Sequence, residues 1–241
     1  MRFAAEITQD MRPQMGLVVL QADETIEDEF RATLTPDVSL LVTRIPSGEE
    51  VSADSLAEMK NHLGRAVSLF PSGKSFDVIG YACTSATAEI GAENVAAEIG
   101  QSVSTRAVTD PLSALVAACQ TLDASRIAFL SPYVEDVSAK IRDRLERSGI
   151  ATPIFGSFSE AEEARVARIS EASIKDAARQ LLQKGAVDAL FTSCTNLRTS
   201  AVRHSVGQEF GLPVLSSNSV LAWHMLALSS ASPNGLRPDA V

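Results

Sequence analysis

A chain of 241 residues, 45% apolar and 21% charged, has the composition of an ordinary globular protein and enough length for one large or two medium domains. The formal net charge of −9, together with the lack of any run rich in Lys and Arg, argues against a nucleic-acid-binding surface. No apolar run approaches the ~20 residues of a membrane span, and the N-terminal stretch lacks the apolar core of a signal peptide. We therefore expect a cytoplasmic protein with no membrane partner.

The first half of the sequence alternates short apolar runs with helical patterns. The apolar runs predict four β-strands, at 16–20, 38–45, 78–82 and 106–108. Helices are predicted between and after them, at 26–33, 55–70, 85–99 and, capped by Asp110, at 111–122.

The second half repeats this order. Four further strands are predicted, at 127–130, 150–155, 189–192 and 213–215. The accompanying helices are predicted at 137–148, 161–183, 199–210 and, capped by Asn218, up to residue 228. The last residues, 233–241, are expected to form a mobile tail.

Each half, residues 15–123 and residues 124–230, therefore carries the order βαβαβαβα. Right-handed crossovers turn that order into a four-stranded parallel sheet. We predict an α/β protein of two pseudo-symmetric Rossmann-like domains, whose sheets meet at a shared cleft through their carboxyl ends. Open α/β sheets bind ligands at these ends, so the active site is expected in the cleft between the domains.

Two similar segments, Asp77–Ala86 and Asp188–Leu197, mark this cleft in the sequence. Each begins with Asp, continues as an apolar strand and reaches a cysteine six residues later, at Cys83 and Cys194. Each strand is predicted to stop at its cysteine, where small polar residues open the next helix. Because a helix N-terminus favours both carboxylates and thiolates, the pattern predicts an active site with paired thiols.

The cysteines also have interpretations other than catalysis. A single cysteine after a strand is usually a small buried hydrophobic residue, and Cys119, on a helix face of small apolar residues, fits that role. The sequence has no C-x-x-C, His pair, G-x-G-x-x-G or P-loop that would predict a disulfide, metal or nucleotide site. The thiols themselves must then act as acid, base or nucleophile. The polar residues that follow them are expected to bind a substrate carboxylate or simply to cap helices; they are Thr84, Ser85, Thr195 and Asn196.

The segments YACTSAT and FTSCTNLRT, with LSPYVED between them, resemble the aspartate/glutamate racemase superfamily, and within it the branch of maleate cis-trans isomerases and arylmalonate decarboxylases. The resemblance implies two pseudo-symmetric α/β domains, no cofactor, a homodimer and a substrate carboxylate held between the cysteine loops. In the isomerases the first cysteine adds to the substrate alkene and the second protonates the neighbouring carbon. By position these are Cys83 and Cys194, with Tyr133 as a carboxylate ligand. Decarboxylases of this branch keep only the second cysteine, so Cys83 argues against that activity.

Two acids depart from the isomerase pattern. Asp23, in QADETIE, stands where those enzymes carry Asn, and Glu163, in EEARVARI, aligns with a second Asn. A carboxylate accepts hydrogen bonds and repels an anion, whereas an amide can donate to it. The substitutions therefore favour a substrate with an amino group, as in the similar proteins of ectoine-utilisation clusters. The alternative is that both acids point to solvent.

We therefore predict a cofactor-independent isomerase or racemase that acts at the carbon next to the carboxylate of a small, amino-bearing acid. The first alternative is maleate cis-trans isomerisation through a thioether adduct on Cys83. The second is a non-catalytic protein that binds a small molecule in an inherited cleft, and the third is a structural globule with coincidental cysteines. The paired thiols and their hydroxyl neighbours speak against the last two.

Overall fold

The computed structural model describes residues 1–8, 10–231 and 236–241, and it contains two four-stranded, all-parallel β-sheets. The strand order is β2-β1-β3-β4 in the first sheet and β6-β5-β7-β8 in the second, so both sheets have the same topology. The strands are β1 (Gln14–Leu20), β2 (Ser39–Ile45), β3 (Ser75–Ala82), β4 (Ser104–Thr109), β5 (Arg126–Tyr133), β6 (Ala151–Glu160), β7 (Ala189–Thr192) and β8 (Val214–Ser216). The predicted α/β class with two parallel sheets is confirmed.

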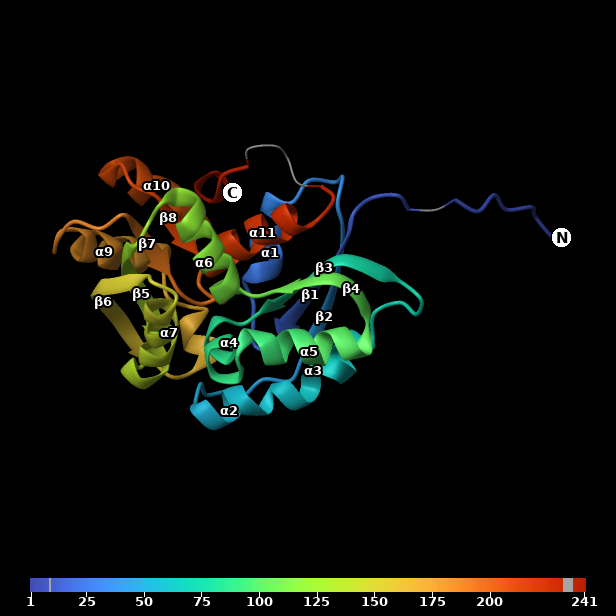
Figure 1. Cartoon of the computed structure of the whole chain (residues 1–241), viewed down its shortest axis with the longest axis horizontal. Helices are drawn as coiled ribbons and strands as arrows, with labels where there is room; N and C mark the ends of the chain where they lie inside the picture. Colours follow the sequence, from blue (N-terminus) through green and yellow to red (C-terminus); the bar gives the residue numbers. More distant parts are fainter. Residues whose placement is uncertain (9, 232–235) are drawn as a thin grey trace.

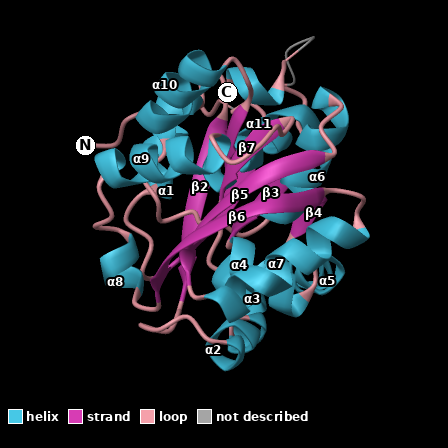
Figure 2. Ribbon diagram, turned by 90° about the vertical axis from the view of Figure 1, so that its left-hand side faces the viewer, coloured by secondary structure: helices cyan, strands magenta, loops and turns pink. Residues whose placement is uncertain are grey.

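Helices cover both faces of the sheets (Figure 2). Those of the first half are α1 (Ile26–Thr33), α2 (Ala53–Glu58), α3 (Lys60–Val67), α4 (Thr84–Ile90), α5 (Ala92–Ser102) and α6 (Pro111–Leu122). Those of the second half are α7 (Glu135–Arg147), α8 (Glu163–Val166), α9 (Glu171–Leu182), α10 (Ser200–Phe210), α11 (Ser217–Leu228) and the 3₁₀ helix η1 (Pro238–Ala240).

The last helix of each half packs against the sheet of the other half (Figure 1). Helix α6 places Cys119 in the same buried cluster as Phe129 and Phe191 of the second sheet. Helix α11 lies against β3 of the first sheet, where a Cβ atom on Gly80 would come within 2.5 Å of the Sδ atom of Met225. The two predicted halves are therefore interlocked through their last helices.

Two helices of the first half that were predicted as continuous are broken in the structure. The helix predicted at 55–70 divides at Met59 into α2 and α3. The helix predicted at 85–99 divides at Gly91, whose φ of 91° lies in a region that residues with a Cβ rarely adopt. Helix α4 is therefore short, and its first turn lies directly after Cys83.

The long helix predicted at 161–183 is also wrong, because it divides into α8 and α9. Ser170 caps α9 through its Oγ atom, which accepts a hydrogen bond from the Ser173 N–H at 3.1 Å. The break leaves α8 as a separate short helix, and its first residue, Glu163, is buried beside the candidate site.

The C-terminal end differs from the prediction in two ways. Ser216, rather than Asn218, caps α11 through a reciprocal capping box. The described part of the predicted mobile tail is packed, since the Trp223 indole N–H donates to the carbonyl of Leu236 at 3.0 Å. Residues 233–235 of that tail lie outside the described residues.

The aspartates that begin the two repeated segments have matching structural roles. The Asp77 carboxylate accepts a hydrogen bond from the Gln14 N–H at 2.8 Å, where β1 begins. The Asp188 carboxylate accepts hydrogen bonds from the Ser125 and Arg126 N–H groups, both at 2.8 Å, where β5 begins. Each aspartate therefore fixes the start of the neighbouring strand, and the cysteine that follows it stands at the opposite end of the sheet.

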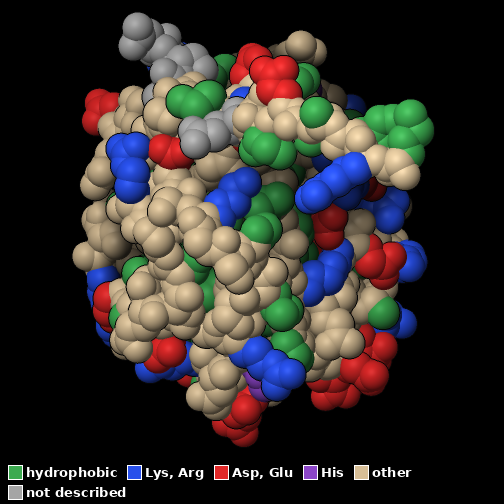
Figure 3. Space-filling view, turned by 90° about the vertical axis from the view of Figure 1, so that its right-hand side faces the viewer, with side chains coloured by type: hydrophobic (Ala, Val, Ile, Leu, Met, Phe, Trp, Pro, Cys, Tyr) green, Lys and Arg blue, Asp and Glu red, His purple; other side chains and the backbone are tan. Residues whose placement is uncertain are grey.

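Among the residues that the structure describes, each helix falls short of the length and hydrophobicity that a membrane span needs. On the face drawn in Figure 3, the Lys and Arg side chains lie in small separate groups among acidic and apolar ones. That face therefore offers no broad basic area of the kind that binds a nucleic-acid backbone.

Candidate active site

A small cavity between the two cysteine loops collects every residue that the sequence marked for a site. Its volume is about 10 Å³, the space of about one water molecule. None of the nine residues concerned is more than 6% exposed. Leu20 completes the lining, together with Asp23, Cys83, Thr84, Ser85, Tyr133, Glu163, Cys194, Thr195 and Asn196. The residues come from both halves of the chain.

Cys83 stands at the carboxyl end of β3 and caps α4. Its position between a strand and a helix start is as predicted, and its Sγ atom accepts a hydrogen bond from the Ala86 N–H at 3.3 Å. Burial is the main cause that raises the pKa of the Cys83 thiol to about 12, and the negative charges of Glu163 and Asp23 add to it. The thiol is therefore protonated at neutral pH in this structure.

Cys194 is held differently. It follows β7, but α10 begins only at Ser200, so the helix N-terminus expected at this thiol is absent. The backbone of Cys194 has a φ of 106°, which is uncommon for a residue with a side chain. Its Sγ atom accepts a hydrogen bond from the Asn196 N–H at 3.2 Å. Burial first, and then the charge of Glu163, raise the pKa of this thiol well above its usual value.

Tyr133 connects Cys194 with Glu163. Its hydroxyl donates to the Oε1 atom of Glu163 at 2.8 Å and lies 3.0 Å from the Sγ atom of Cys194. The other oxygen of Glu163, Oε2, accepts a hydrogen bond from the Asn196 side-chain amide at 3.1 Å. Both oxygens of Glu163 are thus engaged by the protein, while burial raises the pKa of its carboxyl group.

Asn196 also ties the Cys194 loop to the loop after β1. Its Oδ1 atom accepts a hydrogen bond from the Glu24 N–H at 2.9 Å, and its Nδ2 donates to the carbonyl of Ala22 at 3.2 Å. The Thr25 hydroxyl donates to the backbone carbonyl of Asn196 at 3.1 Å. The Asn196 side chain therefore holds the two halves together as well as lining the cavity.

Asp23 has one engaged and one free carboxylate oxygen. Its Oδ1 atom accepts hydrogen bonds from the N–H groups of Thr25 and Ile26, at 2.8 and 2.9 Å, and so closes the turn into α1. Its Oδ2 atom is buried and has no hydrogen-bond partner within the described part of the chain. Burial raises the pKa of this carboxyl group, against the effect of the two N–H donors.

Sequence reasoning missed Ser217, which joins the two cysteine loops from the start of α11. Its Oγ atom accepts a hydrogen bond from the Cys194 N–H at 2.9 Å and lies 2.8 Å from the Oγ1 atom of Thr84. The available signal was the run Ser216–Ser219, which begins at the last residue of β8, much as the cysteines follow β3 and β7. That run marks a third strand end with polar residues.

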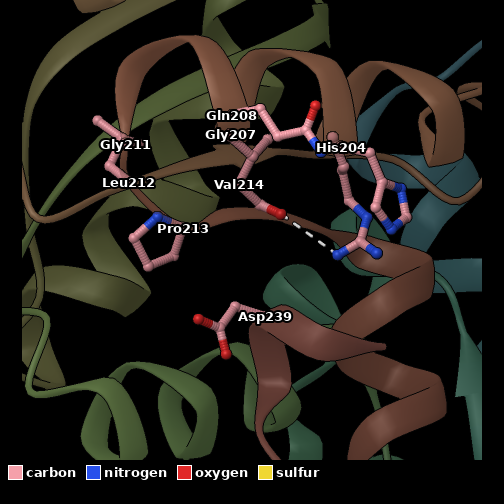
Figure 4. Close-up of a pocket in the computed structure, with 9 residues that line it drawn as sticks. His204, Gly207, Gln208, Gly211, Leu212, Pro213, Val214 and Asp239 are labelled. Carbon is pink, nitrogen blue, oxygen red and sulfur yellow. Dashed lines mark hydrogen bonds between the residues drawn. The ribbon is translucent and has the colours of Figure 1, made fainter.

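The larger cavities lie elsewhere. One of about 340 Å³ lies beside α10 and β8, and its lining includes His204, Val214 and Asp239 (Figure 4). Arg203, which also lines it, donates to the carbonyl of Val214 at 3.3 Å. Another, of about 770 Å³, shares Arg203 and His204 with it. Neither includes a cysteine or a predicted site residue among its described lining.

In the described residues, no group of three or more His, Cys, Asp and Glu side chains is placed to hold a metal ion. The small cavity therefore remains the candidate site.

Comparisons with known proteins point in the same direction. The family model for arylmalonate decarboxylase matches residues 56–236. A curated maleate isomerase from Nocardia farcinica is 30% identical over 225 residues, which cover 88% of this chain and 88% of that protein.

Solved structures share the fold along nearly the whole chain. A mutant of the Nocardia farcinica maleate cis-trans isomerase, with a covalently bound succinylcysteine intermediate, is 28% identical with a TM-score of 0.79, covering 90% of this chain and 92% of that one. The maleate isomerase from Pseudomonas putida with maleate also has a TM-score of 0.79, at 21% identity, and the match covers 89% of this chain and 90% of that one. Arylmalonate decarboxylase is 20% identical with a TM-score of 0.70, covering 93% and 94%. The last two likenesses show the fold alone.

Proposed function

The chain belongs to the arylmalonate decarboxylase family, and on that premise we propose that it is an isomerase or racemase in which Cys83 and Cys194 act together on one small carboxylic acid. The observation that carries the proposal is that both thiols, from corresponding strand ends of the two sheets, line the same cavity. A pair of thiols can remove and return a proton on opposite sides of a carbon atom without a cofactor. The hydroxyls of Thr84 and Ser85 support the binding of the substrate carboxylate.

The pair can serve two closely related reactions. In a 1,1-proton transfer, one thiolate removes the proton from the carbon next to the carboxylate, and the other thiol protonates that carbon from the opposite side. In a cis-trans isomerisation, the Cys83 thiolate forms a C–S bond to one alkene carbon, and the displaced electron pair takes a proton from Cys194 at the next carbon. After rotation about the new single bond, Cys194 removes the proton again, the double bond re-forms and the C–S bond breaks.

Asp23 favours a substrate that carries an amino group. Asp23 lines the cavity, and its buried Oδ2 atom is an acceptor without a partner among the described residues, which suits an ammonium group or another hydrogen-bond donor. An ionised Asp23 in contact with a second substrate carboxylate would oppose it by about 4 kcal/mol at 4 Å and an effective dielectric near 20. The same estimate favours an ammonium group by a similar amount.

Maleate isomerisation is the second candidate, because the curated Nocardia farcinica relative is a maleate isomerase at 30% identity. The raised pKa of Asp23 is compatible with it, since a protonated carboxyl group donates a hydrogen bond as the corresponding amide would. The two candidates therefore differ in the charge state of Asp23 when substrate is bound.

Solvent-deuterium exchange, followed by NMR over a panel of small amino acids and unsaturated diacids, tests the proposal. We expect exchange or turnover with an amino acid and poor turnover of maleate, and Asp23→Asn should shift the preference towards diacids. Glu24→Gln is the matched control, because this neighbouring acid lies outside the cavity and pairs with Arg168. Efficient conversion of maleate to fumarate by the unaltered protein would overturn the amino-substrate proposal in favour of the second candidate.

A further inference from the structure

We infer that Glu163 is the terminal proton acceptor of a relay that runs from the Cys194 thiol through the Tyr133 hydroxyl. The inference rests on the proposed function, because it concerns how one thiol of that site becomes a base. It also gives different roles to Asp23 and Glu163, the two acids that differ from the isomerase pattern. One oxygen of Asp23 has no partner among the described residues, whereas both oxygens of Glu163 are engaged by protein groups.

The direction of the relay follows from counting protons. Tyr133 has a single O–H, and it donates to Glu163 Oε1 at 2.8 Å. The 3.0 Å contact between the Tyr133 oxygen and Cys194 Sγ must then use the S–H of the cysteine as donor. The Asn196 amide holds the second carboxylate oxygen at 3.1 Å and fixes the orientation of Glu163. Three groups in line therefore point the thiol proton towards a carboxylate.

The transfer conserves charge within the site. The S–H proton of Cys194 moves to the Tyr133 oxygen while the Tyr133 proton moves to Glu163. This leaves a thiolate, a neutral phenol and a carboxylic acid. No proton is exchanged with solvent, and the reverse transfer restores the thiol. In the 1,1-proton transfer, the thiol that removes the proton must first become a thiolate, so the relay serves the direction in which Cys194 is the base. In the cis-trans isomerisation Cys194 becomes a thiolate by giving its proton to the substrate carbon, so that reaction does not need the relay.

The surroundings make Glu163 a suitable acceptor. Besides Glu163 and Cys194 themselves, the titratable groups that act on either of them are Asp23 and Tyr133, and neither of these is a cation. Burial raises the pKa of Glu163, which makes its carboxylate a stronger base than an exposed carboxylate. The amide that the isomerase pattern places at this position could not accept the proton.

The test measures the rate at which iodoacetamide alkylates Cys194 between pH 5 and 10, with peptide mapping by mass spectrometry and no substrate present. We expect the unaltered protein to show a plateau around neutral pH. In Glu163→Gln the rate at pH 7 should fall at least ~10-fold and rise steadily up to pH 10, because only free thiolate then reacts. Tyr133→Phe, which cannot pass on a proton, should give the same profile.

An increase in the alkylation rate of Cys194 at pH 7 in Glu163→Gln would overturn the inference. If Glu163 acted only through its charge, which raises the pKa of Cys194, then Glu163→Gln would alkylate faster at pH 7 rather than more slowly. Glu162→Gln, at the exposed neighbouring acid, is the matched control and should leave the profile unchanged. Labelling of the buried Cys119 in the same samples reports unfolding. Since no substrate is used, failure of the relay and failure of the proposed reaction are read from separate experiments.

Discussion

Each thiol of the candidate site is held by a backbone N–H a few residues further along the chain, yet the two have different neighbours. Cys83 caps a helix, and its Sγ atom accepts one backbone hydrogen bond. Cys194 lies in the loop after β7 and has a positive φ, and its sulfur also contacts the hydroxyl of Tyr133. A pair of chemically identical groups in unequal surroundings is suited to unequal steps of one reaction.

Replacing either thiol by a hydroxyl should remove the chemistry and keep the fold. We expect Cys83→Ser and Cys194→Ser each to lower turnover at least ~100-fold, because a serine hydroxyl is far less acidic than a thiol and is a poor base at neutral pH. Cys119→Ser is the control, since that residue is packed between α6 and the second sheet and should affect stability rather than rate. Steady-state kinetics and thermal unfolding measure the two effects. Near-normal turnover in either site variant would contradict the two-thiol mechanism.

The buried Cys83 thiol should also make folding sensitive to alkaline pH. The folded protein raises the pKa of this thiol from 9.0 to about 12, so the thiol ionises at lower pH in the unfolded chain than in the folded one. The contribution of the buried neutral thiol to the free energy of unfolding is therefore complete below pH 9 and is lost as the pH rises towards 12. Between pH 8 and 10 the free energy of unfolding should fall by about 1 kcal/mol through this group. Urea unfolding with a reductant measures it, and Cys83→Ser should show a fall smaller by that amount. Parallel pH curves for the two proteins would contradict the prediction.

Cys83 and Cys194 could be selected from the sequence because strand ends in parallel sheets converge, so they needed only correct strands. Tyr133, Asp23 and Glu163 were selected through the resemblance to the isomerase family. The partners of these residues could not be selected in the same way. Ser217 reaches both cysteine loops from the last helix of the chain. The hydrogen bond between Tyr133 and Glu163 joins β5 to α8 across 30 residues. Such contacts depend on packing between distant segments, which a local pattern does not encode.

Helix breaks were the main error in the predicted elements. Periodicity continues through Gly91 and through the segment before Ser170, so the apolar pattern alone predicted continuous helices. The causes of the two breaks are local: Gly91 has a positive φ, and Ser170 caps the helix that follows it. Only the second break brings a functional group to the cavity, since it separates Glu163 from α9.

The contact between β3 and α11 should be sensitive to a single methyl group. A Cβ atom at Gly80 would lie 2.5 Å from the sulfur of Met225 and 3.3 Å from Leu17, so Gly80→Ala should lower the free energy of unfolding by about 1–3 kcal/mol. Gly100→Ala is the matched control, because it lies within α5 with nothing inside 4 Å and should stabilise the protein by roughly 0.5–1 kcal/mol. Urea denaturation of both variants measures the contrast. Equal stabilities would contradict the close packing of α11 on β3.

The exchange of last helices makes the two sheets one folding unit. We propose the halves 15–123 and 124–230 as structural domains, but each lacks the helix that covers part of its own sheet. Calorimetry should therefore show a single transition whose calorimetric and van't Hoff enthalpies agree. The isolated segment 15–123 should fail to fold, because the apolar face of α6 would lose the second sheet. Two resolved transitions would instead show independent domains.

The smallness of the cavity has a consequence for chemical damage. A space of about 10 Å³ admits no small acid, so the lining must move apart before substrate enters and again before product leaves. While it is closed, both thiols are protonated and hidden, and peroxide oxidises mainly exposed thiolates to sulfenic acid. Oxidative loss of activity should therefore increase with the number of times the cavity opens rather than with storage time. An enzyme that is turning over substrate should lose activity to peroxide faster than the same enzyme without substrate.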